Sequence, residues 1–170
     1  MRLLAIVIAI IVAAACSAAP GGTSPPPTTM GTALTVTASP SRSAPTGTVT
    51  LSDTECHSDV PAALPVGPVE LSLASTASLR TVVGLWRIPD DHTITELRER
   101  VDQELQLADA GKPLLGHPEY LVEGAFAELG PGETRSLTHA TRAGAYAIIC
   151  LRRDAAGLVP FDVLGPFRAT

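Results

Sequence analysis

The residues of this sequence best suited to metal or thiol chemistry are its three cysteines and four histidines. Cys150 follows the apolar run "AGAYAII", and neither histidine nor methionine occurs after it. A cysteine in this setting can be a metal ligand, a catalytic thiol or half of a disulfide. A catalytic thiol needs a base beside it. His57 follows Cys56, but adjacent residues of a strand point to opposite faces, which argues against a thiol–imidazole pair there.

The histidines are spread along the chain, without the close spacings that are typical of metal sites. His92 stands at the start of a predicted helix and His117 precedes a proline in a loop, so both are expected to be solvated. His57 and His117 nevertheless remain candidate metal ligands, because distant residues converge in a folded sheet protein. An acid such as Asp59 or Glu119 would complete such a site.

The N-terminus, "MRLLAIVIAIIVAAAC", predicts an export signal over residues 1–15. Arg2 supplies a basic start, residues 3–12 form an apolar run and residues 13–15 are small. The run is too short to span a membrane permanently. Three small residues before Cys16 resemble a bacterial lipobox, although Ala13 stands where leucine is preferred. This resemblance implies a lipoprotein signal peptide and acylation of Cys16, for example by palmitate. A plain secretory signal with an incidental cysteine is the alternative.

Residues 16–47 are rich in proline, serine, threonine, glycine and alanine, and Arg42 is their only charged residue. Such a segment buries too little apolar surface to offset the entropy of ordering, so it is predicted to be a tether. Acyl chains on Cys16 would hold the protein to membrane lipid. The expected location is therefore the extracytoplasmic face of the cell membrane. The net charge of −5 argues against nucleic acid as a partner.

Residues 48–170 show the pattern of an all-β domain. Short runs such as "TVTLSDTEC", "GPVELSLAST" and "AGAYAIICLR" alternate at period two between turn residues, which favours a two-sheet β-sandwich. One inserted helix is predicted over about residues 94–110, because Thr93 and Glu96 form a capping box and Leu97 and Val101 share a face. The charged side of this helix is expected to be solvated, and Trp86 to lie in the core or on the sheet surface.

Three further segments carry a resemblance to a known family. The frame "GPVELSL", then "LGPGET", then "AGAYAIIC", resembles the cupredoxin-like domains of bacterial secreted proteins and lipoproteins. The inserted helix is similar to a version common in actinobacterial lipoproteins. The resemblance implies a cupredoxin-like Greek-key β-sandwich of seven or eight strands, and it covers nearly all of residues 48–170.

The same resemblance gives expectations for Cys150. Copper-binding members carry histidine and methionine in the loop after this cysteine, whereas this chain has Phe161 and Pro166 at those places. Neither side chain can ligate a metal, so a copper site and any other cofactor are not expected. Resembling domains commonly pair an early cysteine with the late one. With Cys16 acylated, Cys56 and Cys150 remain as an even pair in an exported protein, and a disulfide between them is favoured.

The sequence thus predicts a membrane-anchored lipoprotein that presents a copper-free binding or interaction module and is not an enzyme. Its partner would be an envelope protein or a small ligand. The alternative is an envelope copper-binding or electron-transfer protein that uses a non-standard set of histidines. An envelope enzyme is the third possibility, although no G-x-S-x-G, H-E-x-x-H or phosphate-loop motif occurs.

Overall fold

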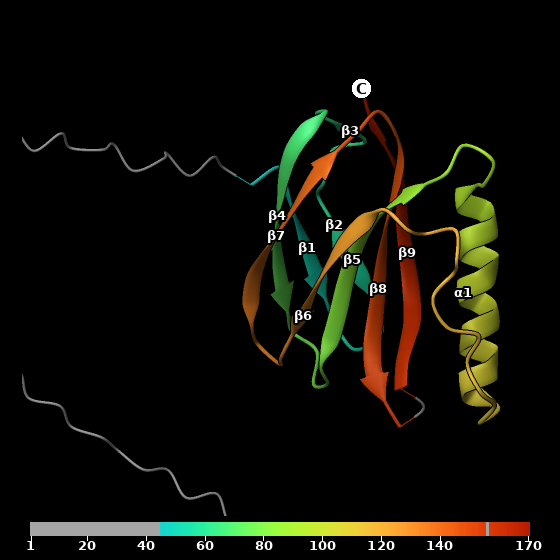
Figure 1. The fold of residues 1–170 in the computed structure, drawn as a ribbon. Coiled ribbons are helices and arrows are strands. Elements are labelled where there is room, and N and C mark those ends of the chain that lie inside the picture. The colour runs from blue at the N-terminus through green and yellow to red at the C-terminus, as the bar shows by residue number, and fades with distance from the viewer. Residues whose placement is uncertain (1–44, 156) are drawn as a thin grey trace, which may run out of the picture. The chain divides into compact units, whose positions relative to one another are not determined.

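A computed structural model describes residues 45–155 and 157–170 of the chain. The predicted signal peptide, Cys16 and the tether up to residue 44 lie outside these residues. The described part is a two-sheet β-sandwich with one helix beside it (Figure 1). None of the helical structure described is long and apolar enough to cross a membrane.

The first sheet has four strands in the order β2-β1-β4-β7. They are β1 (Gly47–Leu51), β2 (Cys56–Ser58), β4 (Gly67–Ser75) and β7 (Thr134–Thr141). β1 runs parallel to β4, and the other neighbours are antiparallel. β4 alternates strictly, with Val69, Leu71 and Leu73 buried between the sheets and their neighbours partly exposed. This is the period-two pattern that predicted the strand.

The second sheet has five strands in the order β3-β9-β8-β5-β6. They are β3 (Ala63–Leu64), β5 (Thr81–Ile88), β6 (Gly124–Leu129), β8 (Gly144–Asp154) and β9 (Gly157–Ala169). The first five residues of β5 are all buried, because one face of this strand meets the inter-sheet core and the other is covered from outside. Leu85 and Ile148 join the inter-sheet core, whereas Ile88 and Ile149 belong to a second core beneath the helix.

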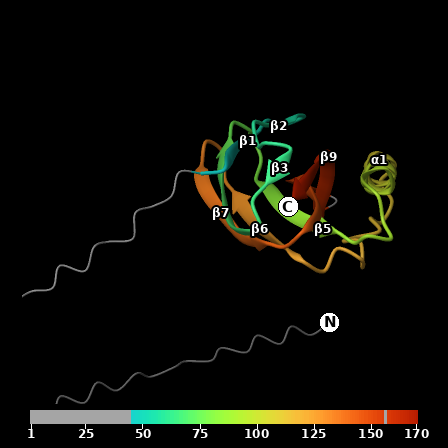
Figure 2. The same cartoon turned by 90° about the horizontal axis from the view of Figure 1, so that it is seen from above.

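The chain crosses from one sheet to the other after β2, β3, β4, β6 and β7, which gives the connections of a Greek-key sandwich. The predicted all-β fold class, a Greek-key β-sandwich with one inserted helix, is confirmed, although the described residues form nine strands where seven or eight were expected. Figure 2 shows the two layers from above, with the helix outside the second layer beside β9.

The C-terminal tail departs from its predicted form. It was expected to keep the shape of a ligand loop, but it is the 13-residue strand β9, which pairs with β8 along its length. The apolar residues of the tail explain the difference, since Val159, Val163 and Phe167 are buried. Cys150 accordingly lies within β8 and not at its end. Cys56 begins β2.

The helix α1 (Ile94–Asp109) begins and ends as its sequence predicts. The Thr93 hydroxyl accepts the N–H of Glu96, and the Glu96 carboxylate accepts the N–H of Thr93 at 2.8 Å, so the capping box is formed. At the other end Gly111 has a φ of +61°, and the N–H of Lys112 reaches the carbonyl of Leu107. This is a Schellman termination, which glycine permits.

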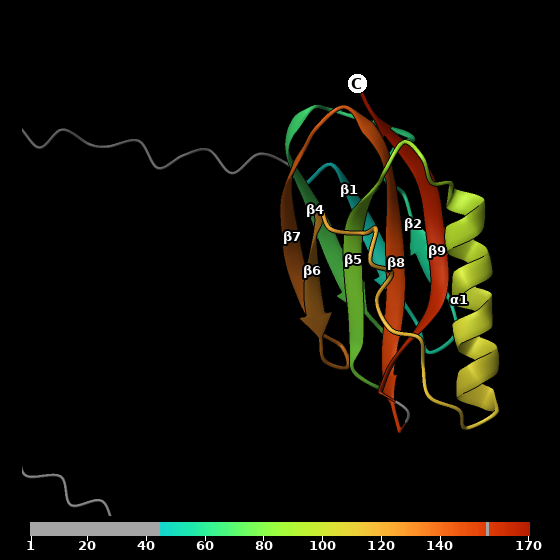
Figure 3. The ribbon, with the colours of Figure 1, turned by 45° about the vertical axis from the view of Figure 1, so that its right-hand side comes forward.

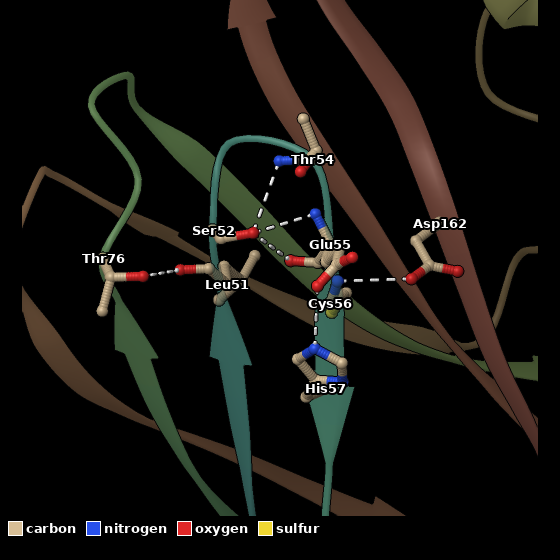
Figure 4. A network of polar contacts seen from close by, with 8 residues as sticks. All are labelled: Leu51, Ser52, Thr54, Glu55, Cys56, His57, Thr76 and Asp162. Carbon is tan, nitrogen blue, oxygen red and sulfur yellow. Dashed lines mark hydrogen bonds and ion pairs between the residues drawn. The ribbon is translucent and has the colours of Figure 1, made fainter.

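A disulfide between Cys56 and Cys150 joins the two sheets, with a Cα–Cα distance of 6.4 Å. The predicted pairing is confirmed. A second link lies beside it, because the N–H of Cys56 donates to a carboxylate oxygen of Asp162 on β9 (Figure 4). The turn between β1 and β2, which leads to Cys56, is closed by Ser52, whose hydroxyl accepts the N–H of Glu55 at 3.0 Å. β2 is therefore held at the second sheet by one covalent bond and one hydrogen bond.

Candidate functional site

A cleft lies between α1 and the outer face of the five-stranded sheet, and we call it the α1 cleft. Its volume is about 540 Å³, which is in the range of small-molecule sites. Strands β5, β6, β8 and β9 form one side, α1 forms the other, and residues of the segment 114–118 close it. Figure 3 shows the segment that follows α1 returning across β8 and β5 towards β6. The apolar side chains of its wall include Val82, Leu97, Val101, Leu114, Ile149 and Leu151.

Trp86 of β5, which lines the cleft, lies against two glycines of the sheet. A Cβ on Gly84, two residues earlier on the same face, would come within 2.2 Å of the indole Nε1. A Cβ on Gly124, the partner of Trp86 on β6, would come within 2.4 Å of the indole ring. A larger residue at either position would displace the ring, because real Cβ atoms essentially never approach so closely. The two glycines therefore let the indole lie flat on the sheet.

His117 covers the other side of Trp86. Their ring centroids are 4.6 Å apart, with the planes tilted by 50°. The Nε2 of His117 donates to the carbonyl of Leu121 at 2.7 Å, which fixes the orientation of the imidazole. His117 was expected to be a solvated loop residue or a metal ligand. It is an exposed loop residue, as the first of these predictions had it, and its ring also packs against the indole and lines the α1 cleft.

Arg100 and Glu104 form the polar part of the helix side. Glu104 is only 3% exposed, and one of its oxygens accepts the N–H of Leu115 at 3.0 Å. The other oxygen lies 3.6 Å from Nη2 of Arg100, which also donates to the carbonyl of Gly116 at 3.2 Å. These contacts tie the segment 114–118 to α1. Glu104 lies on the buried face of the helix, whereas charged residues of the opposite face, such as Glu99 and Asp102, are exposed, as predicted.

Two buried polar atoms in this pair lack a hydrogen bond among the described residues. They are Nε of Arg100 and Oε1 of Glu104. An unpaired buried polar atom costs free energy, so such atoms mark places where a further partner would be stabilising. The sequence gives no sign of this pair beyond the i, i+4 spacing of an arginine and a glutamate on one helix.

Two more charged residues line the cleft at the sheet. Glu128 of β6 lies 3.7 Å from Arg153 of β8 and 3.4 Å from Arg80. Near them, Phe126 is 67% exposed and Leu158 is 39% exposed, although both line the cleft. Large apolar side chains at this exposure define an open, apolar rim. The charged residues of the wall are two arginines and two glutamates, so their formal charges cancel.

A second hollow adjoins the first and shares Arg100 and His117 with it. His92 stacks on Tyr120 there, with centroids 4.0 Å apart, and lies 3.4 Å from Glu96. Burial, followed by the negative charge of Glu96, raises the pKa of Tyr120. The N–H of Thr93 holds the pKa of Glu96 below its ordinary value. Glu96 thus lies near His92, while Arg100 is paired with Glu104.

The candidate metal ligands do not converge. His57 is exposed on β2 of the first sheet and lies 3.1 Å from Glu55, whereas His117 lies against Trp86 of the second sheet. Within residues 45–155 and 157–170, no group of three or more histidine, cysteine, aspartate or glutamate side chains could hold a metal ion. The disulfide also occupies the thiol groups of both domain cysteines, so neither is a free thiolate ligand or nucleophile. Phe161 packs beside the inter-sheet core, and Pro166 is exposed.

The fold and the pairing of its strands define a two-sheet β-sandwich with a ligand-sized cleft under its inserted helix. No family model and no curated protein matches the chain. Among solved structures, the chain is similar to reduced auracyanin from the photosynthetic bacterium Roseiflexus castenholzii, at 18% identity and a TM-score of 0.36. The match covers 61% of this chain and 81% of that one. A likeness at this level carries no argument about function.

Proposed function

We propose that this protein is a lipid-anchored, extracytoplasmic binding module that takes a small apolar ligand in the α1 cleft. The single observation that carries the binding role is the cleft itself. It combines a ligand-sized volume, a mostly apolar wall and an open rim at Phe126 and Leu158. Concave apolar sites with a few polar groups are the usual form of small-molecule sites in proteins.

The membrane anchor is the second part of the proposal. The residues before Cys16 support it through their resemblance to a lipobox, and the composition of residues 16–47 supports a tether. An acylated Cys16 would place the cleft at the surface of a membrane. A site that takes apolar ligands is well placed there, since apolar molecules concentrate in the lipid phase.

The copper-binding alternative lacks a supporting arrangement of donors. A copper electron-transfer site uses a thiolate and two imidazoles at one place. Cys150 is bonded to Cys56, and its sheet partner on β9 is Asp162. Of the histidines, His57 and His117 belong to the surroundings of different sheets. The chemistry of these residues therefore favours ligand binding over electron transfer.

The test uses the neutral, apolar fluorophore N-phenyl-1-naphthylamine and the full chain in phospholipid nanodiscs, with empty nanodiscs to correct for partitioning. Trp86 is the only tryptophan and lines the cleft, so energy transfer from it reports binding there. We expect saturable binding that Val82→Phe abolishes by filling the cleft. Val66→Phe, on an exposed residue outside the cleft, is the matched control. Equal binding by the wild type and Val82→Phe would refute the proposal.

A further inference from the structure

The polar groups of the α1 cleft identify the head group that a ligand should carry. We propose that the cleft selects an apolar molecule with one uncharged hydroxyl, which interacts with Arg100 and Glu104. This inference rests on the proposed function, because it assumes that the cleft binds a ligand at all.

The charge of the wall is the first argument. Arg100 is paired with Glu104, and Arg153 with Glu128, so the cleft offers no net charge to a ligand. A buried carboxylate head would meet Glu104, and a buried ammonium head would meet Arg100. Either ion would lose its hydration without gaining a partner that is free to pair, which is costly in an apolar site. A neutral head avoids this cost.

The second argument is the pair of unsatisfied atoms. Nε of Arg100 is a donor and Oε1 of Glu104 is an acceptor, both are buried, and neither has a hydrogen bond among the described residues. A hydroxyl group is at once a donor and an acceptor. It can accept from the arginine and donate to the glutamate, and so satisfy both atoms together. Neither atom is reached by solvent, so binding includes a small shift of these side chains towards the cleft.

The other contacts of Glu104 set the geometry of this site. Its Oε2 already accepts the N–H of Leu115, whereas Oε1 lies 3.6 Å from Nη2 of Arg100 and accepts no hydrogen bond among the described residues, so Oε1 is the oxygen for a ligand hydroxyl. Nη2 of Arg100 is bonded to the carbonyl of Gly116, which leaves Nε as the unsatisfied donor. The apolar residues on the sheet side, such as Val82, Ile149 and Leu151, then surround the rest of the ligand.

The experiment compares four probes of equal chain length: 1-octanol, octanoate, octylammonium and n-octane. Binding is followed by Trp86 emission in the full chain held in nanodiscs, with empty nanodiscs as the reference. We expect 1-octanol to bind at least tenfold more tightly than either charged probe, and more tightly than the alkane after correction for partitioning. If octanoate, octylammonium or octane binds as tightly as octanol, the head-group inference is wrong while cleft binding stands. If none of the four binds, the proposed function itself is wrong.

Two substitutions test the assignment to these residues. Glu104→Gln can still accept from the Leu115 N–H but removes the negative charge beside Arg100. We expect it to weaken octanol binding about tenfold and to strengthen octanoate binding by a similar factor. Arg100→Met should instead strengthen octylammonium binding, which keeps the proposal testable if the first variant does not fold. Glu99→Gln, on an exposed residue of the same helix, should leave every ratio unchanged. An unchanged octanol-to-octanoate ratio in folded Glu104→Gln would overturn the inference.

Discussion

The indole of Trp86 occupies the space where Gly84 would carry a side chain. A Cβ at that glycine would lie 2.2 Å from the indole nitrogen. Glycine in the interior of a strand weakens it and commonly marks a place where another group approaches closely. Here the approaching group is the side chain two residues further along the same strand. The flat placement of the tryptophan in the α1 cleft therefore depends on the absence of one methyl group.

Replacing Gly84 with alanine should consequently disturb the cleft. We expect Gly84→Ala to destabilise the fold by about 1–3 kcal/mol, as overpacking does, and to shift the emission of Trp86. Denaturant unfolding and fluorescence measure the two effects. Gly130→Ala is the control, since the nearest atom to its Cβ would be a flexible glutamate oxygen at 3.4 Å. Equal stability and identical emission in the wild type and Gly84→Ala would contradict this account.

The capping box makes the stability of α1 depend on pH. The N–H of Thr93 lowers the pKa of Glu96 from its ordinary value of 4.5. The carboxylate is thus more acidic in the folded chain than in the unfolded one. Its contribution is fully present above about pH 4.5 and is lost as the pH falls through the lower folded pKa.

We therefore expect Glu96→Gln to destabilise the protein most above about pH 5, and the difference from the wild type to shrink towards about pH 3. Urea unfolding at several pH values gives this difference directly. Glu99→Gln removes one charge from the same helix outside the capping box and serves as the control. A difference that grew as the pH fell would have the wrong sign for this mechanism.

The disulfide should contribute strongly to stability because it closes a long loop. Cys56 and Cys150 are 94 residues apart, and the chain-entropy model gives about 4–5 kcal/mol for a loop of this size. The double variant Cys56→Ser with Cys150→Ser should lose about that much free energy of unfolding. Thiol titration in denaturant without reductant should find neither cysteine reactive in the wild type. Two reactive thiols in a Cys16→Ala background would show that the bond is absent.

The proposed acylation of Cys16 predicts how the protein distributes in a cell. We expect the wild type to sediment with membranes and to incorporate a labelled palmitate. Cys16→Ala should abolish the labelling and release the folded domain from the membrane fraction. Ser17→Ala, one residue further on, leaves the lipobox-like residues intact and is the matched control. Labelled Cys16→Ala protein would place the acyl chain elsewhere.

The sequence predicted most of the sandwich because its strands alternate between apolar and polar residues. A strand shows this alternation when one of its faces is buried and the other is not. It predicted the helix and both of its ends, since Thr93, Glu96 and Gly111 act through local backbone bonds. It did not predict β9, because family resemblance favoured a loop and the apolar residues of the tail are interrupted by Pro160 and Pro166. The strand nevertheless forms, with irregular register against β8.

Most of the candidate site could not be predicted from the sequence. The α1 cleft is assembled from four strands, a helix and a loop that are distant in the chain. Burial of Glu104 depends on how the segment 114–118 folds back onto α1, which no local pattern records. Gly84 was the one available signal, because a glycine inside "TVVGLWRI" breaks the strand propensity without ending the strand. The disulfide was easier to predict, because Cys56 and Cys150 are the two cysteines that remain once Cys16 is assigned to acylation.

The Cys56–Cys150 bond also determines how the domain would carry a mechanical load. Tension applied through residue 45 and the C-terminus would pass along β1, cross the disulfide at the first residue of β2 and continue along the end of β8 and along β9. The residues between the cysteines, 57–149, include β5, α1 and β6 and would not be extended while the bond is intact. In a single-molecule pulling experiment, full unfolding of the oxidised domain would therefore release a contour length shorter by roughly 310–340 Å than that of the reduced domain. The part of the cleft wall between the cysteines, such as Val82 and Leu97, would therefore keep its length, whereas Leu158 and Pro160 of β9 lie on the loaded path.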